Sequence, residues 1–187
     1  MNWGIGDFLY ICSYKMDFME LIDYTNKWVT GEINEGRAIM IAGIVALLVT
    51  VVLWRCCSQE IVRALLIPLL IVGLFHTGTG VGMIILNRQR VEQFAQQYQQ
   101  QTPQEFAQAE QARVDGFMGL YPQTIIWSTV ILVVAVCLFA FFQAHWARGT
   151  ALVMIYLALS LLVIDYFSKY RADVYQQELK EFITENI

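Results

Sequence analysis

The sequence predicts an all-α polytopic membrane protein, with four transmembrane helices and a helical hairpin that protrudes between the second and the third. Three observations predict this fold. The 187 residues are 57% hydrophobic and 15% charged, with a mean hydropathy of +0.50, whereas soluble domains carry about 25% charged residues. The apolar residues fall into four uncharged runs, each close to the roughly 20 helical residues that cross a bilayer. Between the second and third runs, apolar side chains recur at helical spacing.

The composition also excludes several classes of protein. A net charge of −4 and a pI near 5.1 are unlike the basic surface of a nucleic-acid-binding domain, so we expect no nucleic-acid partner. The high apolar content argues against a disordered chain. The 4 cysteines form no CxxC pair and no Cys/His cluster with zinc spacing. We therefore expect no metal and no cofactor, and membrane lipid as the first partner.

The N-terminal segment, residues 1–37, is rich in aromatic and acidic side chains. Its pattern predicts an amphipathic helix near residues 16–29 that ends at Gly31. Because the segment is acidic, packing onto protein is favoured over binding to a membrane surface.

The first transmembrane hairpin is expected over residues 38–86, with uncharged runs at 38–54 and 64–86. Small residues on the second run predict close approach of another helix: Gly78 and Gly82 have GxxxG spacing, and Gly73 precedes them. Whether that contact lies within the chain or between subunits stays open.

Two ionisable residues lie within or at the end of the expected spans, and such residues are functional hypotheses by default. His76 lies near the middle of the second run, whereas Asp165 ends the fourth. Their depths differ by about 10–15 Å at 1.5 Å per helical residue, so a direct pair is not expected. A neutral His76 bonded to a neighbouring helix is favoured over a proton or metal role, which needs a second ligand at that depth.

Residues 87–123 predict the helical hairpin. Its first arm continues the second span outward, and Thr102-Pro103-Gln104-Glu105 has the hydroxyl cap, the early proline and the glutamate of a new helix start. The alternatives are a glutamine-rich disordered loop, a hairpin that packs only on itself, and a Glu110–Arg113 pair that is merely solvated. We expect one face of the hairpin to bind a partner, through Phe94, Tyr98, Phe106, Glu110, Arg113, Phe117 and Tyr121.

The second transmembrane hairpin is expected over residues 124–167, followed by a helical tail over 168–187. Four spans place both termini and the 87–123 hairpin on one side of the membrane. Most of the 12 Lys and Arg residues lie on that side, but their density is higher in the two short turns. The positive-inside rule therefore leaves both orientations open.

Catalysis is not indicated by any motif. The sequence holds no recognisable nucleophile–base pair and no phosphate-binding glycine motif, and the spans lack the rows of polar residues that line a substrate path. We therefore expect a protein that is not an enzyme.

The string Glu105-Phe106, Glu110, Arg113-Val114, Phe117-Met118 and Tyr121 resembles a pattern in small four-pass bacterial membrane proteins that are encoded beside secreted toxins and are regarded as immunity proteins. The resemblance covers residues 86–122 and the four-span layout. It implies a bacterial inner-membrane protein that binds and neutralises a cognate toxin, and it supplies no catalytic residues. The alternatives are a homo-oligomeric channel or transport component, and an accessory subunit of a larger membrane complex.

Overall fold

The computed structural model describes the backbone of residues 5–185 and the side chains of residues 18–184. Cys12 and the aromatic side chains ahead of Phe18 lie outside the described side chains. Within the described range all regular secondary structure is helical, so the all-α prediction is confirmed there. The helices are α1 (Ile5–Cys56), α2 (Glu60–Gln100), α3 (Pro103–Met118), α4 (Tyr121–Phe141) and α5 (His145–Glu185).

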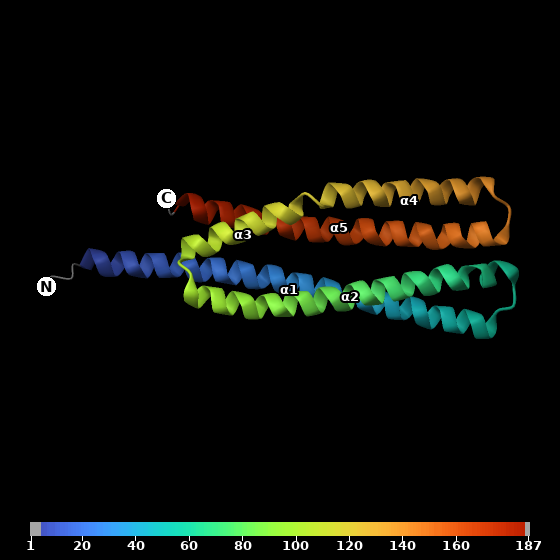
Figure 1. Ribbon diagram of the computed structural model, residues 1–187, viewed down its shortest axis with the longest axis horizontal. Helices are drawn as coiled ribbons and strands as arrows, with labels where there is room; N and C mark the ends of the chain where they lie inside the picture. Colours follow the sequence, from blue (N-terminus) through green and yellow to red (C-terminus); the bar gives the residue numbers. More distant parts are fainter. Residues whose placement is uncertain (1–4, 186–187) are drawn as a thin grey trace.

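The helices form two long antiparallel pairs that lie side by side (Figure 1). One pair is α1 with α2, and the other is α4 with α5; α5 contacts both helices of the first pair. The short turns at 57–59 and 142–144 lie at one end of the molecule. At the other end α3 runs back from the end of α2 and packs chiefly on α5.

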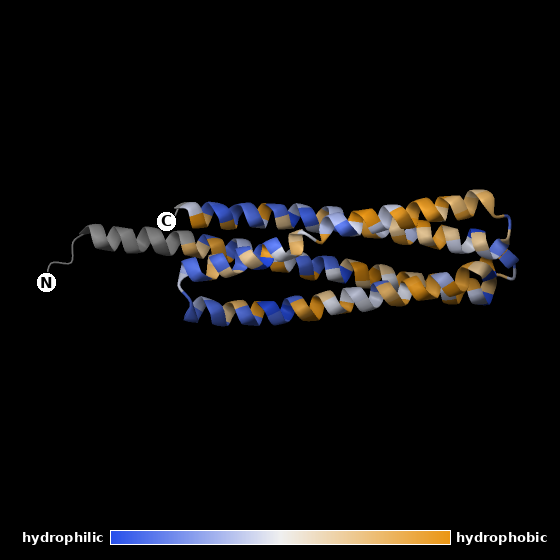
Figure 2. Ribbon diagram, turned by 45° about the horizontal axis from the view of Figure 1, so that its top comes forward, coloured by the Kyte–Doolittle hydropathy of each residue, from blue (hydrophilic) through white to orange (hydrophobic). Residues whose placement is uncertain are grey.

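Hydropathy divides the molecule along its length (Figure 2). Hydrophobic residues gather toward the two short turns, and hydrophilic residues gather toward the α2–α3 connection. Four helical stretches are long and apolar enough to cross a membrane: Phe18–Cys56, Glu60–Gln100, Pro103–Phe141 and His145–Thr184. In their most apolar windows at most 22% of the residues are buried within the protein. Soluble proteins rarely expose so large an apolar surface, so the exposed apolar residues are consistent with a multi-pass membrane protein.

Glycines let α1 and α2 meet backbone to backbone. Gly36 and Gly43 lie two turns apart on α1, and Gly73 and Gly80 lie two turns apart on α2. A Cβ atom added to Gly80 would lie 2.5 Å from the Gly36 carbonyl oxygen, and one on Gly73 would lie 2.8 Å from Leu47 Cδ2. The close contact expected of small residues in a membrane therefore holds this pair together.

The GxxxG spacing of Gly78 and Gly82 suggested that another helix packs closely on them, but no described helix of this chain does so. A Cβ atom added to either residue would meet nothing within 4 Å among the described residues. Only Gly73, of the three glycines singled out in the sequence, lies in the α1–α2 contact. The reason is geometric, since Gly73 and Gly80 share the face of α2 that meets α1.

The expected helix end at Gly31 is wrong, because α1 continues without a break to Cys56. Gly31 instead provides room for a side chain from α5: a Cβ atom there would lie 2.8 Å from Cδ of Arg171. A glycine that sequence reasoning assigns to a helix end here serves a tertiary contact within a helix.

The predicted start of α3 is confirmed. The Thr102 hydroxyl accepts a hydrogen bond from the Glu105 amide at 3.3 Å, and the Glu105 carboxylate accepts one from the Thr102 amide at 2.9 Å. The backbone and side-chain hydrogen bonds of Thr102 lower the pKa of Glu105. Because α2 runs unbroken to Gln100 and α3 starts at Pro103, the disordered-loop alternative is wrong.

A hydrophobic core lies in the hydrophilic half of the molecule, which we call the polar head: residues 18–35, 87–118 and 168–184. The two arms that were expected to form a hairpin pack there with α1 and α5. The α1 residues of this core support the expectation that the N-terminal segment packs onto protein. The buried members of this core are Leu21, Trp28, Val29, Phe94, Phe106, Ala107, Val114, Tyr175, Leu179 and Phe182.

Candidate functional site

The face of 87–123 that was expected to bind a partner lies inside the polar head. Phe106 is 0% exposed, and Phe94 and Glu110 are each 4% exposed. The remaining members of the face, Tyr98, Arg113, Phe117 and Tyr121, are partly buried. The expectation that this face is open to a partner therefore needs correction, because its helical stripe is covered by α1 and α5.

An ion pair occupies the centre of the polar head. Arg113 Nε donates to Glu110 Oε1 at 2.9 Å, and the Tyr175 hydroxyl donates to Glu110 Oε2 at 3.1 Å. Thr25 Oγ1 lies 3.0 Å from the Tyr175 hydroxyl oxygen, so the network joins α1, α3 and α5. The pair is not the solvated helix pair that was the alternative. A buried carboxylate with several partners is costly to disrupt, because losing one partner leaves a charge uncompensated.

Aromatic rings surround the same ion pair. The Arg113 guanidinium carbon lies 4.7 Å from the centroid of the Trp28 ring, and the Trp28 ring stacks on Tyr175 with a centroid distance of 5.3 Å. Burial raises the pKa of Tyr175, and the nearby Glu110 carboxylate raises it further. Burial also raises the pKa of Tyr98 to about 12. Neutral Tyr175, which donates a hydrogen bond to Glu110, is thus built into this centre.

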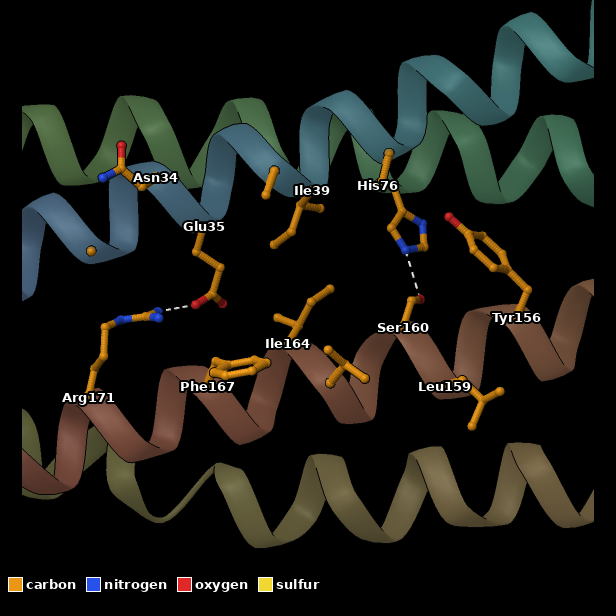
Figure 3. A pocket seen from close by; sticks show the side chains of 14 residues that line it. Asn34, Glu35, Ile39, His76, Tyr156, Leu159, Ser160, Ile164, Phe167 and Arg171 are labelled. Atoms are coloured by element: carbon orange, nitrogen blue, oxygen red, sulfur yellow. Dashed lines mark hydrogen bonds and ion pairs between the residues drawn. The ribbon is translucent and has the colours of Figure 1, made fainter.

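A second charged cluster lies at the edge of the polar head that borders the apolar half, and we call it the rim: Glu32, Glu35, Ser168 and Arg171. Arg171 Nη2 donates to Glu32 Oε1 at 3.0 Å. It also binds Glu35 Oε2, as the dashed line in Figure 3 shows. Ser168 donates to Glu32 and is 3.1 Å from the Tyr121 hydroxyl oxygen. Burial raises the pKa of Glu35, although Arg171 opposes the shift. The rim therefore connects α1, α4 and α5.

A groove of about 730 Å³ leads from the rim into the apolar half between α1 and α5 (Figure 3). Its walls are mostly apolar, with Ile39 from α1 and Leu159, Ile164 and Phe167 from α5. Its volume lies within the range of about 300–1,000 Å³ that is usual for small-molecule sites. The groove thus has a charged end and an apolar end.

His76 closes the apolar end of the groove. Its Nδ1 is 3.0 Å from the Val72 carbonyl oxygen, which can only accept, and its Nε2 is 2.9 Å from Ser160 Oγ on α5. The Tyr156 ring stacks on the imidazole at 5.8 Å. The arrangement matches the expectation of a histidine bonded to a neighbouring helix. Asp165 is not among the hydrogen-bond partners of His76, and its Oδ2 is buried with no partner among the described residues.

The described residues give no group that suits metal chemistry. Within the described part of the chain, no three His, Cys, Asp or Glu side chains lie close enough to hold a metal ion. Cys56, Cys57 and Cys137 are free thiols. The arrangement offers buried charges, aromatic faces and an apolar groove, which are features that suit binding.

Sequence reasoning missed Glu32, Glu35 and Arg171. A signal for them was present, because Glu32 and Glu35 stand one turn apart just before the first apolar run, and Arg171 stands just after the fourth. Antiparallel helices bring those two ends to the same depth. Opposite charges at matching ends of two spans could therefore have predicted the rim.

Comparison with protein-family models, with curated proteins and with solved structures found no match to this chain. The fold and the site define its class: an all-helical bundle with four helices able to span a membrane and a packed polar head. A groove leads from the rim of the head into the apolar half.

Proposed function

We propose that this chain is a multi-pass membrane protein that acts without catalysis, by contact between its polar head and a protein partner. In particular, we propose that it is an immunity protein of the bacterial inner membrane, which binds and neutralises a secreted toxin. The head would then stand outside the bilayer on four membrane-spanning helices, with both chain ends on its side.

One observation carries this proposal: the exposed outside of the head bears two rows of glutamine. Gln89, Gln93, Gln96 and Gln100 follow helical spacing on α2, and all four are exposed. Gln104 and Gln108 form a second, shorter row one turn apart on α3, and both are exposed. We call these six residues the glutamine rows.

The glutamine rows suit a protein interface for a physical reason. The centres of protein interfaces are depleted in charged residues, since burying an unpaired charge costs far more than burying an amide that finds a partner. Each glutamine offers both donors and acceptors. The core beneath the rows, which includes Phe94 and Phe106, holds the two helices in place and so presents the rows as a preformed surface.

The test is a protection assay in cells that produce the secreted polypeptide encoded beside this chain. The intact chain should restore growth. The triple variant Gln93→Lys, Gln96→Lys and Gln108→Lys should abolish protection while the protein still accumulates in the membrane. Gln177→Lys, which adds a single lysine charge on the exposed side of α5 outside the rows, is the control for added positive charge elsewhere on the head and should protect. Full protection by the triple variant would exclude the glutamine rows as the recognition surface.

A second candidate is a self-associating channel, transport component or accessory subunit, and Gly78 and Gly82 favour it. These glycines lie on a face of α2 that no described residue covers closely, where another helix could approach. Liposomes containing the purified protein should then conduct ions, and His76→Ala should alter the flux. Absence of conductance, with a monomeric mass in detergent, would exclude the channel.

A further inference from the structure

The groove between α1 and α5 is an asymmetric site whose chemistry specifies an amphiphile. Ala38, Ile39 and Ala42 form its α1 wall, and Val163 and Ile164 lie opposite on α5. The rim residues Glu35 and Arg171 line the other end. A ligand that satisfies both ends of the groove needs a hydrocarbon chain and a polar headgroup.

The rim carries an acceptor that lacks a donor. The Glu35 side chain is 9% exposed, and its Oε2 binds Arg171. Its other oxygen, Oε1, is buried with no hydrogen-bond partner among the described residues. A buried carboxylate oxygen without a donor is unfavourable, so this atom favours a ligand that donates a hydrogen bond.

The charge of the rim specifies the kind of donor. Two carboxylates, Glu32 and Glu35, share one guanidinium, that of Arg171. The Asp165 carboxylate lies near enough to Glu35 to add to the negative field, and its Oδ2 also lacks a partner among the described residues. Arg90 adds a positive charge near Glu32, but among the charged groups that interact with Glu35 itself, Arg171 is the cation and Glu32 and Asp165 are carboxylates. A donor that is also a cation therefore matches Glu35 best.

The depth of the rim indicates that this cation belongs to the headgroup of a lipid. Glu35 stands just before the uncharged run 38–54, and Arg171 stands beyond the uncharged run 149–164, so the rim lies at the boundary of the apolar half. From Glu35 to Ala42 the α1 wall extends about 10 Å toward His76. Asn34, which lines the groove, accepts a hydrogen bond at 2.9 Å from the exposed Arg37, so a cation stands beside the groove at the same boundary.

We propose that this groove binds phosphatidylethanolamine, with the ammonium group against Glu35 Oε1 and one acyl chain along the apolar walls toward His76. An ethanolamine ammonium group has N–H donors, whereas choline is a quaternary ammonium with none, and glycerol carries no positive charge. The site therefore selects among lipids by the headgroup, since all three can carry the same chains. This inference does not depend on the proposed partner of the head.

The test is native mass spectrometry of the full chain in detergent with an equimolar mixture of dioleoyl phosphatidylethanolamine, phosphatidylcholine and phosphatidylglycerol. The chain should retain phosphatidylethanolamine at least about tenfold over each of the others, as expected for one charge-assisted hydrogen bond. Glu35→Gln should reduce that preference about tenfold. Equal retention of phosphatidylethanolamine and phosphatidylcholine, or a preference for phosphatidylglycerol, overturns the proposal.

A second variant keeps the test decisive if Glu35→Gln loses its helical circular dichroism. Ala42→Phe fills the apolar wall without touching the rim, and it should remove bound phosphatidylethanolamine. Ala140→Phe places the same ring on the exposed side of α4 and should leave lipid retention unchanged. Unchanged retention in Ala42→Phe, or equal loss in both alanine variants, overturns the proposal.

Discussion

Replacing Gly80 with alanine should drive α1 and α2 apart, whereas the same replacement at Gly78 should not. The added Cβ atom at Gly80 would lie 2.5 Å from the Gly36 carbonyl oxygen and 2.8 Å from Met40 Cα. Both are backbone atoms, which cannot rotate away as a side chain can. At Gly78 the added atom would meet nothing within 4 Å among the described residues.

The magnitude follows from two opposing effects. Overpacking a tight contact costs about 1–3 kcal/mol. Alanine is favoured over glycine within a helix by about 0.5–1 kcal/mol, and this gain applies to both variants. Gly78→Ala should therefore raise the free energy of unfolding slightly. The difference between the variants cancels the shared gain and leaves the overpacking cost of about 1–3 kcal/mol.

The assay is reversible unfolding of the purified chain in mixed micelles with increasing sodium dodecyl sulfate, followed by circular dichroism. The midpoint should fall for Gly80→Ala and should stay or rise for Gly78→Ala. Equal shifts for both variants would refute the close α1–α2 contact, because only that contact distinguishes the two positions.

Three further predictions concern the polar head. Burial raises the pKa of Tyr98 to about 12, above the unfolded value of about 10, so the contribution of Tyr98 to stability is intact below pH 10 and is lost as the pH rises through 12. Tyrosinate absorbance should rise together with the loss of helicity, and a fully titrated but folded protein would contradict this prediction. Tyr175→Phe removes the hydrogen-bond donor to buried Glu110 and should lower the free energy of unfolding by about 1–3 kcal/mol. Tyr170 is 65% exposed, so Tyr170→Phe should change the free energy of unfolding by less than about 0.5 kcal/mol. Similar losses for both variants in chemical denaturation would argue against the network. Thr102→Ala should cost about 1 kcal/mol and speed amide exchange at the start of α3; unchanged exchange would mean that the cap is dispensable.

Sequence patterns predicted the helices well where the signal is local. The four apolar runs and the Thr102–Glu105 capping box depend on neighbouring residues, and each led to a helix in the structure. The break expected at Gly31 failed because the role of that glycine is set by Arg171, which is distant in the sequence. Local rules cannot distinguish a glycine that ends a helix from one that admits a side chain.

The candidate site was harder to predict for the same reason. Phe94 on α2 and Phe106 on α3 belong to apolar patterns at helical spacing, and such patterns alone cannot distinguish a core face from a binding face. The deciding fact is that α1 and α5 extend beyond the apolar half and cover these residues. The sequence showed that residues 87–123 are rich in glutamine. The structure added that the glutamine rows lie on the exposed side of the two helices, opposite the buried face.

Recognition by the polar head is tested most directly by the affinity of the purified chain, held in lipid nanodiscs, for the secreted toxin that we propose as its partner. Binding should be saturable at micromolar concentrations or below, weakened at least about tenfold by the triple lysine variant of the glutamine rows and unchanged by Gln177→Lys. No binding by the intact chain, or equal binding by the triple variant, would contradict the claim that the outside of the polar head recognises a protein partner.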